Sequence, residues 1–203
     1  MSRLRDLARR EAPVAAAPEE VCDLCGAPLE AEHRHLLDVS TREISCSCRA
    51  CSLLFDRRAA GGGHFRLIGD RRLRLAGFDV SDATWDELRI PVEMAFFFAD
   101  SVAGRVRAFY PSPMGPTESL LGLEAWQELE LEPDVEALLV DRKRGCWIVP
   151  IDDCYRLVAV IRTRWRGFTG GREVWEEIDR FFADLDRRAK ETTWDSGIAS
   201  RAV

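Results

Sequence analysis

The sequence predicts an α+β protein in which a small cysteine-rich module precedes an antiparallel sheet backed by helices. Two C-x-x-C pairs near the N-terminus have between them enough chain for one β-hairpin. Further along, short apolar runs are separated by turn residues, which is typical of hairpins. Later segments repeat apolar residues at helical spacing. Because hairpins make antiparallel neighbours, a helix-backed antiparallel sheet is the natural arrangement.

The composition indicates a soluble globular protein of one mid-sized domain plus a small module. The chain has 203 residues, 46% of them hydrophobic and 32% charged, and a net charge of −6. An acidic chain attracts nucleic acid or anionic membranes only through a segregated basic patch, so we expect no nucleic-acid partner. No apolar span of ~18 residues is present, and residues 1–10 lack the apolar core of a secretory signal. We therefore expect a cytoplasmic protein without membrane insertion.

Composition along the chain predicts four regions. An Ala/Pro-rich stretch makes residues 1–20 a disordered linker, and the metal-binding module follows at 21–60. The Gly61–Gly63 run marks the boundary with an α+β domain at 64–190. Residues 191–203 are expected to form a flexible tail.

Within the module, a hairpin is expected to carry the chain from the first cysteine pair to the second. His33–Asp38 and Arg42–Ser45 are its strands, with the turn near Val39–Thr41. A further strand is predicted at Leu53–Phe55, directly after the second pair. Such a module has the layout of a zinc ribbon.

The larger domain is predicted as hairpins that alternate with helices and end in two successive helices. Its last helix is the clearest, because one apolar stripe runs along it and Glu/Asp–Arg pairs at i, i+4 line the other face. In chain order we expect a strand pair at 65–75, a helix capped by Ser81 or Asp82 through Leu88, strands at 94–98 and 106–110, a proline loop at 111–116, a helix at 120–129, a hairpin of 135–140 and 146–149, a helix from Asp152 to Gly167, and a helix bearing Val174, Ile178, Phe181, Phe182 and Leu185.

The two pairs, Cys22–Cys25 and Cys48–Cys51, predict a four-thiolate metal site. Zn²⁺ is held well by a tetrahedron of sulfur atoms, and each C-x-x-C turn brings two sulfurs to one ion. Gly26 follows the first pair, as a tight knuckle requires, whereas Ser52 stands at that place after the second. In a cytoplasmic protein such clusters indicate metal more often than disulfides, and the odd total of seven cysteines agrees.

Three further residues complicate the ligand set. Cys46 competes with Cys48, and it is either an alternative ligand or a free thiol beside the site. His33 and His35 can each replace one cysteine, or they lie on a hairpin strand as non-ligands. Five cysteines exceed what zinc needs, so iron is an alternative, either as a rubredoxin-like single ion or as an iron–sulfur cluster.

Other candidates fit structural roles better than chemical ones. Cys146 and Cys154 are expected as buried small hydrophobes rather than a redox pair, and Asp152 as a helix cap. The arginines between Arg66 and Arg74 are the best candidate for a basic surface. The chain contains no G-x-S-x-G, H-E-x-x-H or dinucleotide fingerprint, so the sequence assigns no reaction.

Three groups of residues stand out together: Cys22–Pro28 with Glu32–Leu36; Tyr110–Pro113 with Glu118; and Val149–Asp152, Cys154–Tyr155, Ile161–Trp165 and Gly170–Trp175. In these residues the chain resembles an uncharacterised family of actinobacterial proteins whose genes commonly lie beside nickel–iron hydrogenase genes. The resemblance spans residues 21–185, and it implies an accessory role in hydrogenase assembly or electron transfer.

Three functional hypotheses follow. The first is a non-enzymatic accessory protein whose zinc module docks a protein partner, such as a hydrogenase subunit or maturation factor. The second is an electron-transfer module in which the same four thiolates hold iron. The third, a nucleic-acid-binding regulator, uses the ribbon and the arginine stretch after it.

Overall fold

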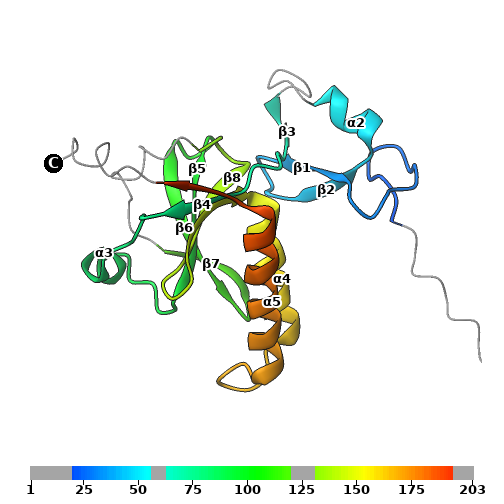
Figure 1. Cartoon of the computed structure of the whole chain (residues 1–203). Helices are drawn as coiled ribbons and strands as arrows, with labels where there is room; N and C mark the ends of the chain where they lie inside the picture. The colour runs from blue at the N-terminus through cyan, green and yellow to red at the C-terminus, as the bar shows by residue number, and fades with distance from the viewer. Residues whose placement is uncertain (1–19, 56–62, 120–130, 194–203) are drawn as a thin grey trace, which may run out of the picture.

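The computed structural model describes residues 20–55, 63–119 and 131–193. It confirms an α+β fold with antiparallel-rich sheets and helices (Figure 1). The expectations for residues 1–19, for a helix at 120–129 and for the tail beyond Thr193 lie outside the described residues.

A three-stranded sheet of order β2-β1-β3 forms the N-terminal part. Its first two strands, β1 (Arg34–Asp38) and β2 (Ile44–Ser47), make the expected hairpin, with Leu36 opposite Ser45. The Asp38 carboxylate accepts hydrogen bonds from the backbone N–H groups of Ser40 and Thr41, which shapes the turn.

The third strand of this sheet corrects the strand pair expected at 65–75. Strand β3 (Phe65–Leu67) pairs antiparallel with β1, whereas β4 (Leu73–Ala76) belongs to the larger sheet. The two segments therefore do not form a hairpin, and the chain between them crosses from one sheet to the other. The three-stranded sheet thus takes one strand from beyond the glycine run.

The strand expected at Leu53–Phe55 is also wrong. Residues Arg49–Leu54 form a short helix, α2, whose N-cap is Cys48. A C-x-x-C knuckle already turns its backbone N–H groups toward the first sulfur, and that geometry continues directly into a helical turn.

The second sheet has seven strands in the order β10-β4-β9-β8-β5-β6-β7. All neighbours are antiparallel except β10 and β4, which run parallel. The expected proline loop at 111–116 instead lies largely within the hairpin of β6 and β7, where Pro111 is opposite Pro116. The start of the expected tail also differs, because it forms β10. The bounds not yet given are β5 Met94–Asp100, β6 Arg105–Ser112, β7 Gly115–Ser119, β8 Glu136–Asp141, β9 Gly145–Pro150 and β10 Lys190–Thr193.

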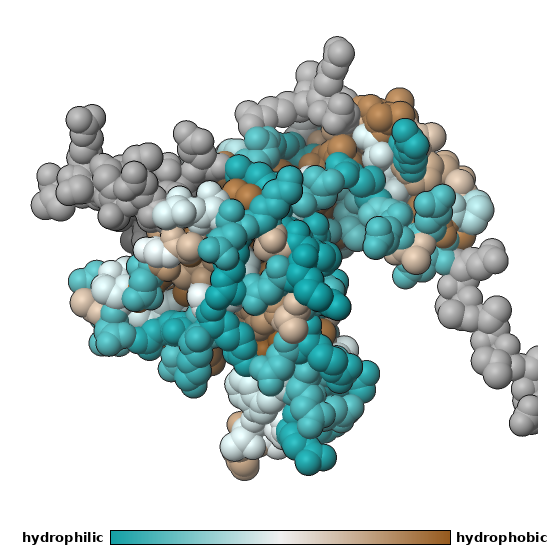
Figure 2. Space-filling model, viewed as in Figure 1, coloured by the Kyte–Doolittle hydropathy of each residue, from teal (hydrophilic) through white to brown (hydrophobic). Residues whose placement is uncertain are grey.

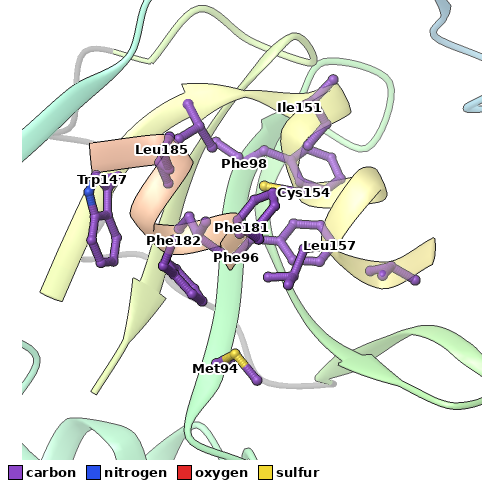
Figure 3. Close-up of a cluster of buried hydrophobic side chains, with 14 of the residues drawn as sticks. Met94, Phe96, Phe98, Trp147, Ile151, Cys154, Leu157, Phe181, Phe182 and Leu185 are labelled. Carbon is purple, nitrogen blue, oxygen red and sulfur yellow. The ribbon is translucent and has the colours of Figure 1, made fainter. Parts of the chain in front are cut away.

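The central strands of this sheet are buried on both faces. Successive side chains of a strand point to opposite faces, so Phe96 and Phe98 of β5 join one apolar cluster and Ala95 and Phe97 join the other. Strands β8 and β9 alternate in the same way. Figure 3 shows the first cluster, where Phe96, Phe98 and Trp147 meet side chains of the C-terminal helices.

Helices α4 (Ile151–Arg164) and α5 (Arg172–Arg188) cover this first cluster, while α3 (Asp82–Glu87) contributes to the second. Ser81 caps α3 as expected. The N-cap of α4 is Pro150 rather than Asp152, and its C-cap is Trp165 rather than Gly167. The apolar stripe predicted for α5 is confirmed, since all of its members are buried: Val174, Ile178, Phe181, Phe182 and Leu185.

The two sheets share part of their core. Leu37 of β1 and Ile68, just after β3, belong to the same apolar cluster as the residues of α4 and α5. Ion pairs also join them, because Arg42 and Arg66 both lie 3.4 Å from the buried Asp134 carboxylate. The cysteine-rich module is therefore packed onto the larger sheet. None of the described helices has the length and apolar character needed to cross a membrane.

Candidate metal centre

The four cysteines of the two C-x-x-C pairs come together at one point of the module. Their Sγ atoms all lie within 4.8 Å of one another, and those of Cys25 and Cys48 are 3.7 Å apart. Two Zn–S bonds of ~2.3 Å at a tetrahedral angle place sulfur atoms about 3.8 Å apart. The four close thiols can bind a metal ion such as zinc.

The first knuckle is a tight turn closed by backbone hydrogen bonds. The N–H of Gly26 donates to the carbonyl of Cys22, and the N–H of Cys22 donates to the carbonyl of Ala27, both at 2.8 Å. Gly26 has φ +72°, a conformation that residues with a Cβ rarely adopt. The glycine after the second cysteine is thus required by the backbone.

The second knuckle needs no glycine because it continues as helix α2. The Cys48 Sγ accepts the N–H of Cys51 at 3.5 Å, and the N–H of Ser52 donates to the Cys48 carbonyl at 2.9 Å. Ser52 therefore has helical backbone angles, and its hydroxyl donates to the Arg49 carbonyl. This explains why the two pairs differ in the residue that follows them.

Asp23 ties the first knuckle to strand β2. Its backbone N–H donates to the Cys46 carbonyl at 3.0 Å, and its carboxylate accepts the Cys46 N–H at 2.6 Å. Because β2 leads directly into Cys48, these bonds set the distance between the two knuckles. In the sequence, this link is signalled only by an acidic residue inside the first C-x-x-C.

The thiols have opposed proton affinities. The backbone N–H of Cys48 lowers the pKa of Cys22 to about 6, whereas the hydrogen bond with Cys25, followed by burial, raises the pKa of Cys51 to about 12. The Ala27 N–H and the Cys51 thiol act to lower the pKa of Cys25, but the thiols of Cys22 and Cys48, together with desolvation, outweigh them, so that pKa is raised. One thiolate forms easily and the crowded sulfurs resist a second negative charge, which a bound cation neutralises.

The three further candidate residues do not join this cluster. His33, His35 and Cys46 form a separate group, whose ligand atoms also lie within 4.8 Å of one another. Cys46 and Cys48 therefore serve different groups, because β2 ends at Ser47 and the chain then turns away. Asp152, expected as a helix cap, instead accepts a hydrogen bond from Nδ1 of His35 at 2.8 Å. Sequence reasoning missed this contact, which joins residues 117 positions apart.

The remaining candidates have structural surroundings. Cys146 and Cys154 are both buried, but they belong to the apolar clusters on opposite faces of the large sheet and form no redox pair. Burial raises the pKa of both thiols, that of Cys146 to about 12. Asp153 is buried beside the guanidinium groups of Arg72 and Arg156, at 2.6 and 3.1 Å.

The arginine stretch that runs from Arg66 in β3 to Arg74 in β4 is paired within the protein. Each of its side chains pairs with a carboxylate of the larger domain, so the stretch does not present an unpaired basic surface. The pairs are Arg66 with Glu132 and Asp134, Arg71 with Glu136, Arg72 with Asp153, and Arg74 with Asp186.

Comparison with known proteins places the chain in a family but not in a function. No curated protein and no solved structure matches it. A family model described as a family of unknown function, DUF5947, matches residues 21–189. The match begins one residue before the first cysteine knuckle and ends just after α5, so it takes in the three-stranded sheet and all of the larger sheet except β10. The chain therefore belongs to the family DUF5947.

Proposed function

We propose that this protein is a non-enzymatic accessory protein in which a zinc ion, held by Cys22, Cys25, Cys48 and Cys51, shapes a docking surface for a protein partner. The observation that best supports this proposal is the apolar surface around the four cysteines. Of the eight large hydrophobic side chains that are exposed in the described part of the chain, four flank the metal ligands in the sequence. They are Val21, Leu24, Leu53 and Leu54.

The knuckles explain why these side chains face water. Leu24 lies inside the first C-x-x-C turn, and Leu53 and Leu54 lie on α2, each 67% exposed. Hydrophobic surface accordingly gathers over α2 at the upper right of Figure 2. Exposed apolar patches beside a rigid framework are typical of protein interaction sites. Zinc would hold that framework in place, because a helix of six residues is not stable alone.

The partner that we propose is a nickel–iron hydrogenase subunit or maturation factor in the cytoplasm. This part of the proposal rests on the resemblance of residues 21–185 to proteins encoded beside hydrogenase genes. The docking surface and the metal site are compatible with that role, and neither requires a reaction centre.

The test is binding to the purified hydrogenase of the same host, measured with the full-length chain. Leu53→Ser with Leu54→Ser is expected to weaken binding at least tenfold, because it removes the apolar anchors and leaves the thiolates untouched. Val102→Ser with Met114→Ser is the matched control, since these side chains are at least as exposed but lie in hairpin turns of the larger sheet. Absence of hydrogenase binding by the wild-type chain contradicts the proposed partner. Equal effects of the two double variants contradict the proposed surface.

One observation favours electron transfer as a second candidate. Cys25 is exposed, so a metal held there would be close to solvent and to a docked redox partner. Thiolate-held iron would serve this function, and zinc would not. The metal that the protein holds after anaerobic purification separates the two candidates.

A further inference from the structure

The geometry points to a second metal site in this protein, formed by His33, His35 and Cys46. It would bind a late first-row divalent ion such as Zn²⁺ through three protein ligands. A fourth position would remain for water or an exogenous ligand. The site is separate from the four cysteines and stands independently of the docking function.

The hairpin places the three side chains on one face. His35 of β1 lies directly opposite Cys46 of β2, and residues directly opposite each other in an antiparallel pair share a face. His33 lies two residues before His35, one position ahead of β1, and its ligand atom joins the same group. The two imidazole rings have centroids 4.8 Å apart, and the ligand atoms of all three residues lie within 4.8 Å. A tetrahedral ion holds such atoms roughly 3.3–3.6 Å apart, which modest side-chain rotations reach.

His33 directs an unpaired nitrogen into this group. Its Nδ1 lies 2.9 Å from the carbonyl of Glu30, which can only accept, so Nδ1 carries the proton. The Glu20 carboxylate, 3.8 Å from the same atom, acts in the same direction. Nε2 is buried and has no hydrogen-bond partner among the described residues, and the side chain is 10% exposed. A buried unpaired polar atom costs about 1–3 kcal/mol, and a bound metal ion would satisfy it.

His35 has the arrangement of a metal-ligating histidine. Its Nδ1 donates to the Asp152 carboxylate at 2.8 Å, which leaves Nε2 with a lone pair. A carboxylate on the far nitrogen fixes the tautomer and ring orientation and makes the ligand nitrogen more basic. Asp152 comes from the first turn of α4, so the larger domain orients a ligand of the module. A hydrogen bond of purely structural value would account for His35, but it would leave Nε2 of His33 unpaired.

The donor set indicates which ions fit. Two imidazole nitrogens and one thiolate suit Zn²⁺, Co²⁺, Ni²⁺ and copper, and they disfavour Mg²⁺ and Ca²⁺. Three protein ligands leave a position open, unlike the four thiolates of the neighbouring site, which complete a tetrahedron. The second ion would therefore be exchangeable and able to take a further ligand, whereas the first would be enclosed.

The experiment is native mass spectrometry of the full-length chain, reduced, loaded with Zn²⁺ and desalted. We expect two zinc ions per chain in the wild type and one in each of His33→Ala, His35→Ala and Cys46→Ala. His64→Ala is the matched control, because His64 is the only other histidine of the chain and lies outside the group; it should retain two. A wild type with one zinc, or a His33→Ala variant that keeps two, overturns the proposal.

Two further measurements keep the proposal testable if an alanine variant fails to fold. Zinc X-ray absorption of the two-metal wild type should show nitrogen as well as sulfur ligands, whereas sulfur alone would overturn the proposal without any variant. Asp152→Asn tests the positioning role of that carboxylate. It should weaken the second zinc 10–100-fold in chelator competition and leave the first unchanged.

Discussion

Gly170, in the turn between α4 and α5, has φ +85° and almost no room for a side chain. A Cβ at this position would lie 2.8 Å from the Val174 side chain and 3.0 Å from the ring of Trp165. Val174 is fully buried in the main core, so it cannot move aside. At the residue scale, this turn can form only because Gly170 has no Cβ.

We predict that Gly170→Ala lowers the free energy of unfolding by about 3 kcal/mol, through the left-handed backbone and the steric overlap together. Denaturant titration measures the change. Gly167→Ala is the control for the backbone contribution, since Gly167 has φ +62° and open space around it. It should lose only about 1 kcal/mol, and equal losses in the two variants would contradict the steric argument.

The sequence predicted the four cysteines because ligand spacing within a knuckle is local. Only the C-x-x-C spacing favoured Cys48 over Cys46 as a ligand, since strand alternation places both on one side until β2 ends. Nor could it pair His35 with Asp152, because that contact depends on how the module packs against α4. The sequence therefore predicted which residues belong to the candidate site, but not which distant residues they contact.

Arg107 of β6 connects three neighbouring strands at the element scale. Its guanidinium lies 2.8 Å from the Asp100 carboxylate at the end of β5 and 2.6 Å from that of Glu118 on β7. Hydrogen bonding by Arg107 lowers the pKa of Glu118. Burial opposes ionisation of Asp100, but the Ala103 N–H and Arg107 outweigh it, so that pKa is also lowered.

We predict that Arg107→Met destabilises the protein by about 2 kcal/mol at neutral pH. A carboxyl group with a lowered folded-state pKa stabilises the fold above its ordinary pKa, near 3.8 for Asp100 and 4.5 for Glu118. That contribution is lost as the pH falls through the folded-state pKa. Urea titrations at pH 7 and pH 3 should therefore show a large difference between variant and wild type at pH 7 and a smaller one at pH 3.

Arg105→Met is the control, since Arg105 is half exposed and contacts only Glu118 of this pair. Exposed ion pairs contribute little, so its loss should stay within 1 kcal/mol. A difference for Arg107→Met that persists unchanged to pH 3 would show that packing, and not charge, supplies the effect.

Sequence patterns predicted elements well where one periodicity dominated. The stripe of α5 and the hairpin of β8 and β9 were readable for that reason. The prolines predicted a loop in the region where β6 and β7 in fact pair. The strands tolerate them because Pro111 and Pro116 lie opposite each other near the sheet edge, where a missing N–H is tolerated. Strand β3 was assigned to the wrong partner because pairing between distant segments leaves no local signal.

For the whole molecule, the proposed metal ion and the apolar core would stabilise different parts. The large sheet has apolar clusters on both faces, whereas the knuckles and α2 contribute few side chains to either. Structural zinc supplies roughly 10–16 kcal/mol of binding free energy in small fingers. Metal would therefore stabilise the part of the module that the core does not reach.

We predict that a strong chelator unfolds the knuckles and α2 while the large sheet stays folded. Hydrogen exchange measures this directly: amides at Gly26, Cys51 and Ser52 should lose protection, and those of β5 and β8 should keep it. Readdition of Zn²⁺ should restore the protection. Unfolding of the whole chain, or no change at the knuckles, would contradict this division.

The central claim is that four thiolates hold a zinc ion, and the metal content of the chain tests it most directly. The protein should be purified anaerobically without added metal or a nickel column, alongside Cys48→Ser with Cys51→Ser. We expect the wild type to hold one tightly bound zinc ion more per chain than the double variant. A wild-type chain without stoichiometric metal would contradict the account, and stoichiometric iron would replace docking with electron transfer.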